Sequence, residues 1–201
     1  MPRCDGLPAR RLLLATHNEH KRRELARVLG GWEIEALPEG LELPPEEAET
    51  FAQNALAKAR AAAAATSRAS IADDSGIEAA ALGGRPGVRS ARYAGEGASD
   101  AENLARLLRE APAGSRLEYV CALAYVDPRT GTERVFEGRC AGTLAPEPRG
   151  ERGFGYDPAF VAEDRPGSET MAQLSDEQKD EISHRGRAAR ALAEWLSATA
   201  G

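Results

Sequence analysis

The sequence predicts an α/β fold built around one mixed β-sheet. Strand-like and helix-like segments alternate along the chain, which is typical of βαβ units. Two long strand-like segments, joined by a turn that contains Asp, Pro and Gly, add an antiparallel hairpin to this pattern. The 201 residues contain no internal repeat and no clear linker, so they are expected to form one domain with a sizeable core.

The N-terminal third is expected to hold two strands and two helices. Apolar runs of strand length alternate with segments of helical length, and Gly30-Gly31 is a suitable stop for the first helix. A capping box formed by Thr50 and Gln53 opens the second helix, whose alanine run has high helix propensity. The predicted elements are strands over residues 11–16 and 32–37, and helices over residues 19–29 and 50–66.

The later elements are predicted from turn residues and helix caps. Residues 70–72 form a short strand that is expected to end in a turn over residues 73–76 (DDSG). The strand over residues 117–127 is apolar on both faces, as a central strand would be. The other predicted elements are loops over residues 83–87 and 153–160, a strand over residues 132–142, and helices over residues 99–110, 175–182 and 184–198.

Composition excludes several classes of function. A formal net charge of −6 argues against non-specific nucleic-acid binding, which needs a basic face, so no nucleic-acid partner is expected. No apolar run reaches about 18 residues, and the start of the chain lacks the apolar core of a secretory signal, so no membrane partner is expected. Residues 1–9 are expected to be a disordered or frayed leader, and residues 10–201 a single domain.

The cysteines indicate a reducing environment. Cys4, Cys121 and Cys140 lack metal-ligand spacing, and their odd number argues against a disulfide framework. A cytoplasmic setting is the simplest interpretation. The hairpin is expected to bring Cys121 and Cys140 near one another, with both thiols reduced.

Two clusters of residues suit phosphate and metal, and each has an ordinary structural alternative. Residues 16–21 (THNEHK) lie at a strand-to-helix turn, where backbone N–H groups and the charge of Lys21 suit phosphate, although Asn18 could be only a helix cap. The adjacent Asp73 and Asp74 suit a divalent cation or a proton acceptor. A polar turn with an Asp cap would show the same two residues.

Two further clusters suit a planar ligand. Residues 153–158 (GFGYDP) combine two glycines with two aromatic rings, which suits close approach and stacking, although a turn with core aromatics is the alternative. Lys179 precedes residues 183–186 (SHRG), in which the arginine could hydrogen-bond the keto oxygen and N7 of a purine. The alternative here is a junction between two surface helices.

Taken together, these segments resemble the inosine/xanthosine triphosphate pyrophosphatase family, whose members remove deaminated purine nucleotides. The resemblance runs from Leu12 to about Leu196. It is carried by T-x-N-x-x-K from Thr16, T-F-x-x-N-A-x-x-K-A from Thr50, A-D-D-S-G from Ala72, L-G-G-x-P-G-V-x-S-A-R-Y-A-G from Leu82, G-F-G-Y-D-P from Gly153 and K-x-x-I-S-H-R-G from Lys179. Every lysine of the chain falls inside one of these motifs: Lys21, Lys58 and Lys179.

The resemblance implies an elongated two-lobed α/β fold around the mixed sheet, with the active site in the cleft between the lobes. It also implies Mg²⁺ as cofactor, a nucleotide as substrate and a homodimer as the assembly. The implied reaction converts ITP, dITP or XTP and water into the nucleoside monophosphate and pyrophosphate. Asp74 is implied as catalytic proton acceptor and metal ligand, with Glu46 as a second metal ligand.

The same resemblance implies the residues that bind substrate. Those implied to hold the triphosphate are Thr16, His17, Asn18, Glu19, His20 and Lys21. Ser75 is implied to contact substrate, with Lys58 and Asp73 in support. Those implied to line the base pocket or to complete base and phosphate recognition are Phe154, Gly155, Tyr156, Asp157, Lys179, His184 and Arg185.

Departures from the family leave alternatives open. Gln53 and Gln173 stand where many members carry Glu, and His17 stands where a small residue is usual. If a Glu at either Gln position tunes the metal, activity is reduced here, and the chain is then a catalytically weak nucleotide-binding module. A pyrophosphatase for modified pyrimidine nucleotides is another alternative, although the His184-Arg185 pair and the Phe154 loop favour a purine.

Overall fold

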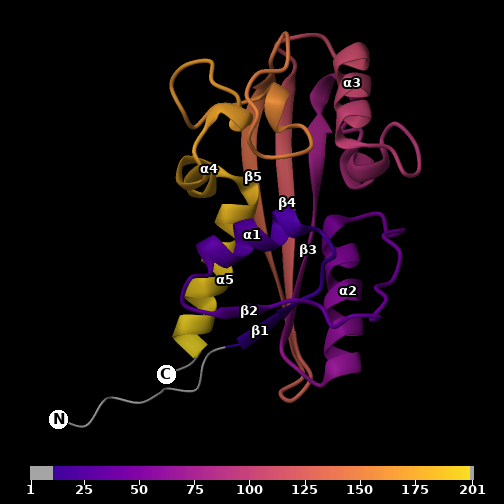
Figure 1. Cartoon of the computed structure of the whole chain (residues 1–201), viewed down its shortest axis with the longest axis vertical. Helices are drawn as coiled ribbons and strands as arrows, with labels where there is room; N and C mark the ends of the chain where they lie inside the picture. The colour runs from indigo at the N-terminus through magenta and orange to yellow at the C-terminus, as the bar shows by residue number, and fades with distance from the viewer. Residues whose placement is uncertain (1–10, 200–201) are drawn as a thin grey trace, which may run out of the picture.

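A computed structural model describes residues 11–199, so the leader expected over residues 1–9 lies outside the described residues. The strands within that range are β1 (Arg11–Leu14), β2 (Glu33–Glu35), β3 (Ser70–Ala79), β4 (Arg116–Asp127), β5 (Thr132–Leu144) and β6 (Phe160–Ala162). They form one sheet in the order β2-β1-β3-β4-β5-β6 (Figure 1). β1 pairs in parallel with β2 and β3, while the pairs from β3 to β6 are antiparallel. The predicted mixed sheet is confirmed, with β4 inside it.

The helices begin at caps that the sequence predicts. The side-chain oxygen of Asn18 accepts from two backbone N–H groups at the start of the first helix, and Thr50 caps the second through the N–H of Gln53. The predicted capping box there is only half formed, because the Gln53 side chain accepts from the Thr50 hydroxyl. Ser99 and Glu102 form a complete capping box. The helices are α1 (Glu19–Val28), α2 (Phe51–Thr66), α3 (Asp100–Glu110), α4 (Asp176–Ile182) and α5 (His184–Thr199). In residues 11–199 no helix has the length and apolar character needed to cross a membrane.

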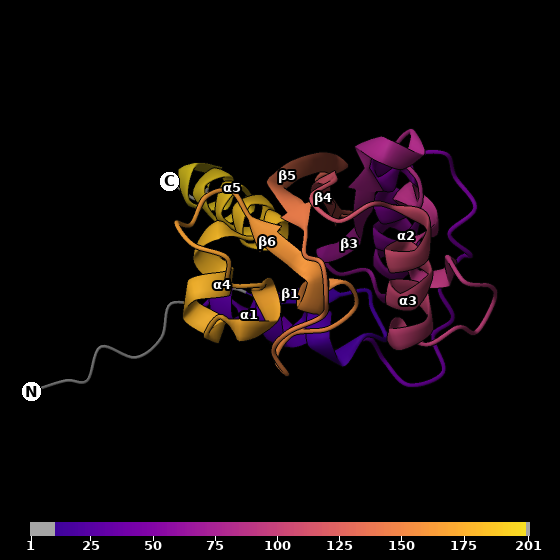
Figure 2. The same cartoon turned by 90° about the horizontal axis from the view of Figure 1, so that it is seen from above.

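Helices cover both faces of the sheet. α1 and α5 pack on one face, where Leu25 and Leu192 belong to the same apolar cluster as Leu123 of β4. α2 packs on the opposite face, where its buried alanines meet Ala72 and Ala122. Figure 2 shows α2 and α3 on one side of the long strands, and α4 and α5 on the other. Burial of these two apolar faces supplies the main favourable free energy of folding.

The long strands β3, β4 and β5 run through two lobes. At one end of them lie β1, β2 and α2, and at the other end lie α3, α4 and β6, as Figure 1 shows. The second lobe has its own apolar cluster, which includes Leu107, Leu117 and Phe160. The elongated two-lobed α/β architecture is therefore confirmed.

Residues 73–76 do not form the predicted turn but lie inside β3. Asp73 pairs with Leu123 and Gly76 with Val120 in the antiparallel ladder to β4. The prediction was wrong because Asp-Asp-Ser-Gly has the chemistry of a turn, whereas here buried cations from distant segments offset the carboxylates. Gly76 is required by packing: a Cβ atom there would lie 2.5 Å from the carbonyl oxygen of Gly87.

The extended backbone sends alternate side chains of β3 to opposite faces of the sheet. Asp73 therefore points to the face covered by α1 and α5, where it meets Lys21 and Arg185. Asp74 points to the face covered by α2, where it meets Asn54. A strand, unlike a turn, gives the two carboxylates separate environments and separate tasks.

The predicted hairpin forms between β4 and β5, closed by a 2.9 Å hydrogen bond from the N–H of Gly131 to the carbonyl oxygen of Asp127. Cys140 pairs with Tyr119, and Cys121 with Gly138, so the cysteines occupy diagonal positions on the two strands. Both thiols are buried, and neither forms a disulfide within residues 11–199. The predicted loop over residues 153–160 ends earlier than expected, because Phe160 already belongs to the short edge strand β6.

Candidate active site

Two adjoining cavities are lined by residues of both lobes. The aromatic cavity is named for Tyr119, Phe154 and Tyr156 in its wall. The loop cavity lies beside the loops that precede α1 and α2. Predicted site residues in the wall of the aromatic cavity are Asn18, Lys21, Glu46, Asp74, Ser75, Phe154, Gly155, Tyr156, Asp157, Lys179, His184 and Arg185. Those in the wall of the loop cavity are Thr16, His17, Lys58, Asn18, Lys21 and Glu46, so the last three belong to both cavities.

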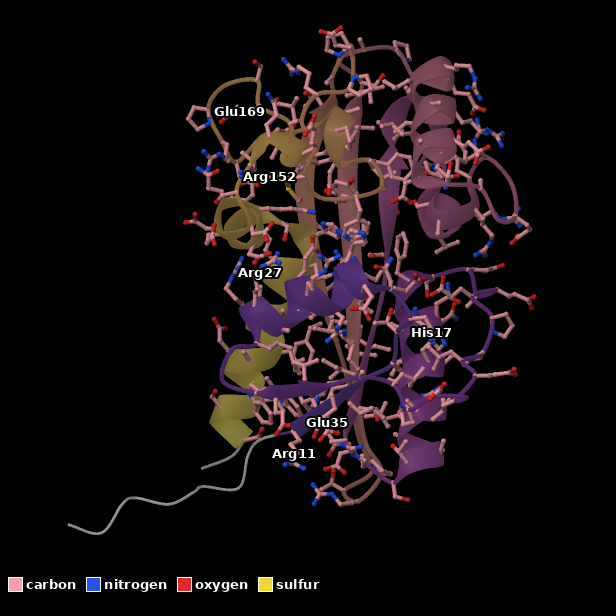
Figure 3. All side chains as sticks on the ribbon, in the orientation of Figure 1. Arg11, His17, Arg27, Glu35, Arg152 and Glu169 are labelled. Atoms are coloured by element: carbon pink, nitrogen blue, oxygen red, sulfur yellow. The ribbon has the colours of Figure 1, made fainter. Side chains whose placement is uncertain are left out.

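Within residues 11–199, two residues implied to hold the triphosphate, Glu19 and His20, lie in neither wall, and neither does the supporting Asp73. The carboxylate of Glu19 accepts a 2.6 Å hydrogen bond from the Arg22 guanidinium on the exposed side of α1. The ring of His20 stacks on that of Phe154. In Figure 3, His17 lies toward α2 and Arg27 lies at the opposite end of α1, where it pairs with Asp180 of α4.

Asn18 serves as a helix cap, which was the alternative to phosphate binding in the sequence analysis. Its Oδ1 accepts from the backbone N–H of His20 at 2.9 Å and from that of Lys21 at 3.1 Å. Two N–H groups that could have met phosphate are therefore already bonded. The Lys21 side chain still reaches both cavities, so its charge is the main attraction for an anion at this turn.

Asp74 sits at the junction of the two lobes with a fixed orientation. Its Oδ2 accepts from Nδ2 of Asn54 at 2.9 Å, and its Oδ1 accepts from the N–H of Ser75 at 2.9 Å. Asn54 is itself fixed, because its Oδ1 accepts from the N–H of Ala48. Burial and the charge of Glu46 raise the pKa of Asp74, against the opposing effects of Lys58, Lys21 and the Asn54 bond. A raised pKa makes a carboxylate a better proton acceptor.

Glu46 and Asp74 form an acidic pair whose charges repel. Lys58 of α2 offsets part of this charge, since its ammonium contacts Glu46 and donates to the carbonyl oxygen of Asp73 at 2.7 Å. Within the described residues, no group of three or more metal-ligating side chains is placed to hold an ion. Two carboxylates that face one cavity nevertheless fit a hard cation that takes its remaining ligands from water and phosphate, which is the usual manner of Mg²⁺.

Asp73 anchors a buried network on the other face of β3. Its Oδ2 lies 3.1 Å from Nζ of Lys21 and 3.1 Å from the Arg185 guanidinium, which also donates to Ser75 Oγ at 2.7 Å. Burial disfavours the charged carboxylate, but Lys21, Arg185 and Lys58 together outweigh it and hold the pKa of Asp73 far below its usual range. Asp73 stays ionised and holds two cations at the cavity wall.

Glu24 completes this network and was missed by the sequence analysis. It lies on the buried side of α1 and accepts from Nζ of Lys179 at 2.7 Å and from Arg185. Burial disfavours its charge, but Arg185 and Lys179 overcome that effect and lower its pKa to about 2. The sequence carried little signal for this role, because Glu24 follows Arg22 and Arg23 in a helix that looks solvated.

The loop that carries Phe154 is held from several directions. Asp157 Oδ2 accepts from the N–H of Phe154 at 2.8 Å and from Nζ of Lys179 at 2.5 Å. The N–H of Gly155 donates to Asp100 at the start of α3, another residue that the sequence analysis did not identify. These bonds fix the loop beside the cavity without filling it.

His184 presents a neutral ring to the aromatic cavity. Complete burial and the neighbouring charge of Arg185 keep the pKa of His184 well below its usual value. The ring stacks on that of Tyr119, with centroids 4.5 Å apart and planes 6° apart, and Tyr119 donates to Asp157. In the described part of the chain, Nδ1 of His184 has no hydrogen-bond partner. The described residues therefore leave the hydrogen-bonding capacity of that buried nitrogen unused.

The Ham1 family model matches residues 12–195. The chain belongs to the Ham1 family. A relative from Geobacillus kaustophilus named dITP/XTP pyrophosphatase is 46% identical, covering 94% of this chain and 96% of the relative. A Bacillus subtilis relative of the same name is 42% identical and covers 92% of this chain and 96% of its own length. The structure of a HAM1 protein from Coxiella burnetii has a TM-score of 0.82 and 35% identity, covering 94% of this chain and 98% of that chain.

The two Gln residues that depart from the Ham1 pattern lie outside the site. Gln53 is exposed and hydrogen-bonds with Thr50 at the start of α2. Oε1 of Gln173 accepts from the N–H of Thr170 in a complete capping box. Neither residue is in the described wall of the two cavities. Their positions give no support to weakened metal binding, whereas His17 does lie in the wall of the loop cavity.

Proposed function

We propose that this chain hydrolyses ITP, dITP and XTP to the nucleoside monophosphate and pyrophosphate, and so removes deaminated purine nucleotides from the nucleotide pool. Relatives named dITP/XTP pyrophosphatase, at 42% to 46% identity over nearly the whole chain, support this activity. The observation that carries the proposal is the meeting of the two cavities at Asn18, Lys21 and Glu46. A nucleotide that binds with its base in the aromatic cavity and its outer phosphates in the loop cavity has its α-phosphate between the two, near Asp74.

The phosphate half of the substrate meets cations that the fold has already oriented. Lys21 lies in both cavity walls, and Lys58 lines the loop cavity. Asp73 orients the Lys21 ammonium from behind, which reduces the reorganisation needed when phosphate arrives. A triphosphate can therefore bind an acidic chain because the positive charge is local.

Asp74 acts as the proton acceptor for the attacking water. Its carboxylate is held by Asn54 and by the backbone, and its raised pKa makes it more basic than an exposed aspartate. Water attacks the α-phosphorus, the bond to the bridging oxygen of the β-phosphate breaks, and pyrophosphate leaves. Lys21 offsets negative charge on the phosphoryl oxygens during this step.

Base selection comes from fixed donors at the other end of the cleft. Arg185 and Lys179 carry only hydrogen-bond donors, and both lie in the wall of the aromatic cavity. A keto oxygen at C6 of the purine accepts such donors. An amino group at C6 places donors against donors, a mismatch that discriminates strongly in a buried site. The neutral His184 adds a polar nitrogen without adding charge.

Glu46 and Asp74 are the residues that would hold Mg²⁺, together with phosphate oxygens and water. When bound, the ion supplies positive charge against the triphosphate and favours ionisation of water. The mutual repulsion of the two carboxylates supports a cation at this place, because a cation relieves it. We further propose a homodimer that acts in the cytoplasm, where the nucleotide pool is. Sedimentation equilibrium tests the dimer.

A substrate panel tests the proposed function. Pyrophosphate release is measured with Mg²⁺ and, in turn, ITP, XTP, dITP, ATP, GTP and a modified pyrimidine triphosphate. We expect kcat/KM for the 6-keto, deaminated purines to exceed that for ATP by at least about a hundredfold. Preference for the pyrimidine nucleotide, or nucleotide binding without turnover, would contradict the proposal.

A further inference from the structure

The ring of His20, in the first turn of α1, lies against the ring of Phe154, in the loop over residues 153–157. The ring centroids are 5.1 Å apart and the planes 27° apart, a stacked arrangement. Phe154 belongs to the wall of the aromatic cavity, whereas His20 is outside both cavity walls as far as the described chain shows. His20 therefore contacts Phe154 from outside the cavity that the base is proposed to enter.

Local contacts orient the His20 ring. The backbone N–H of His20 is bonded to the cap residue Asn18, and the Arg23 guanidinium lies 3.4 Å from Nδ1 of the ring. A guanidinium can only donate, so Nδ1 is the acceptor in this contact. His20 is thus part of an ordered first turn of α1, and its ring is directed at Phe154.

The other contacts of Phe154 come from the loop itself and from two cations. Its N–H is bonded to Asp157, while Lys179 Nζ and the Arg185 guanidinium carbon lie 5.0 Å and 5.6 Å from the ring centroid. His20 adds an aromatic contact from the first turn of α1. The stack therefore ties the loop over residues 153–157 to the helix that also carries Lys21.

We infer that His20 is a positioning residue for base recognition, which holds the Phe154 ring in the orientation that the purine base stacks on. This inference rests on the proposed function. It assigns His20 to the base half of the substrate and not to the triphosphate half.

Three variants and three ligands test the inference. His20→Ala removes the ring, His20→Phe keeps an aromatic ring, and Arg22→Ala is the matched control, because Arg22 pairs with Glu19 on the exposed side of the same helix turn. The measurements are KM and kcat for ITP, the calorimetric Kd for inosine monophosphate, and the inhibition constant of inorganic tripolyphosphate. Tripolyphosphate carries the phosphates but no base.

We expect His20→Ala to raise KM for ITP and Kd for inosine monophosphate about three- to tenfold, with kcat changed less than about twofold. His20→Phe restores both constants, Arg22→Ala leaves them unchanged, and the tripolyphosphate constant is the same in every variant. Unchanged Kd and KM in His20→Ala, failure of His20→Phe to restore them, or an equal weakening of tripolyphosphate would overturn the inference. If the wild-type chain binds inosine monophosphate but releases no pyrophosphate from ITP, the proposed function is contradicted and the inference about His20 is not. The Kd values of the variants for inosine monophosphate then decide the role of His20.

Discussion

The side-chain amide of Asn54 donates a 2.9 Å hydrogen bond to Oδ2 of Asp74, across the interface between α2 and the central sheet. The other end of the amide is fixed by the N–H of Ala48. Since a bond to the charged form stabilises that form, Asn54 limits how far burial and Glu46 can raise the pKa of Asp74. The balance between these effects determines the pH at which the carboxyl group of Asp74, the proposed proton acceptor, is ionised.

Asn54→Ala is expected to shift the pH dependence of turnover. Without the amide, the pKa of Asp74 rises further, and a proton acceptor works only when deprotonated. The acidic midpoint of the kcat profile therefore moves to higher pH in Asn54→Ala than in the wild type. The kcat profile of both proteins checks this. An acid limb in the variant that coincides with that of the wild type would separate Asn54 from the proton acceptor.

Asp74→Asn is expected to lower kcat by at least about a hundredfold, because an amide accepts no proton at working pH. The chain should still fold, because Asn has the shape of Asp and its one oxygen can keep one of the two hydrogen bonds, although its NH2 group then faces the other donor. Circular dichroism and the thermal midpoint check folding beside the kinetics. Asp164→Asn, which alters an exposed ion pair with Arg187, is the matched control. Full activity in Asp74→Asn would remove Asp74 from catalysis.

Glu24→Gln is expected to destabilise the fold at neutral pH more than in acid. The pKa of Glu24 lies at about 2 in the folded chain, below its ordinary value of 4.5. A lowered pKa contributes stability that is present above about pH 4.5 and is lost as the pH falls toward about 2, and this shift corresponds to roughly 3 kcal/mol.

Denaturant unfolding at several pH values measures this contribution. The difference between Glu24→Gln and wild type should be largest near neutral pH and shrink as Glu24 becomes protonated. Glu133→Gln removes an exposed ion pair with Arg60 and should leave the free energy of unfolding almost unchanged at every pH. A difference for Glu24→Gln that stays constant across the acid range would contradict the assigned pKa.

Cys121 and Cys140 are expected to react only after unfolding. Burial, more than any neighbouring charge, raises the pKa values of Cys121 and Cys140 to about 12, so neither forms a thiolate at neutral pH. Titration of the denatured, unreduced chain should find all three thiols. In the native chain, mass spectrometry should find Cys121 and Cys140 unmodified. A single free thiol after denaturation would instead indicate a disulfide.

Local sequence signals predicted the helices well. Ser99 and Glu102 are only three residues apart, so the capping box that opens α3 can be predicted from these two residues without knowledge of the rest of the fold. The hairpin after Asp127 is equally local. The motifs also predicted that segments far apart in the sequence lie together, since Lys21, Asp74 and Arg185 line one cavity.

The features that were missed depend on residues far apart in the chain. Asp73 and Asp74 look like a turn until Lys21 and Arg185 are brought beside the strand. Glu24 looks solvated because its partners Lys179 and Arg185 lie on α4 and α5. β6 has three residues and is defined by its pairing with β5, so its own sequence carries little strand signal.

Hydrolysis of ITP in isotopically labelled water tests the central claim, that the cleft places the α-phosphate at Asp74. If the attack occurs at the α-phosphorus, the heavy oxygen enters inosine monophosphate and the pyrophosphate carries none. Mass spectrometry of the two products distinguishes these outcomes. Label found in the pyrophosphate, or orthophosphate as the initial product, would contradict the proposed placement of the substrate.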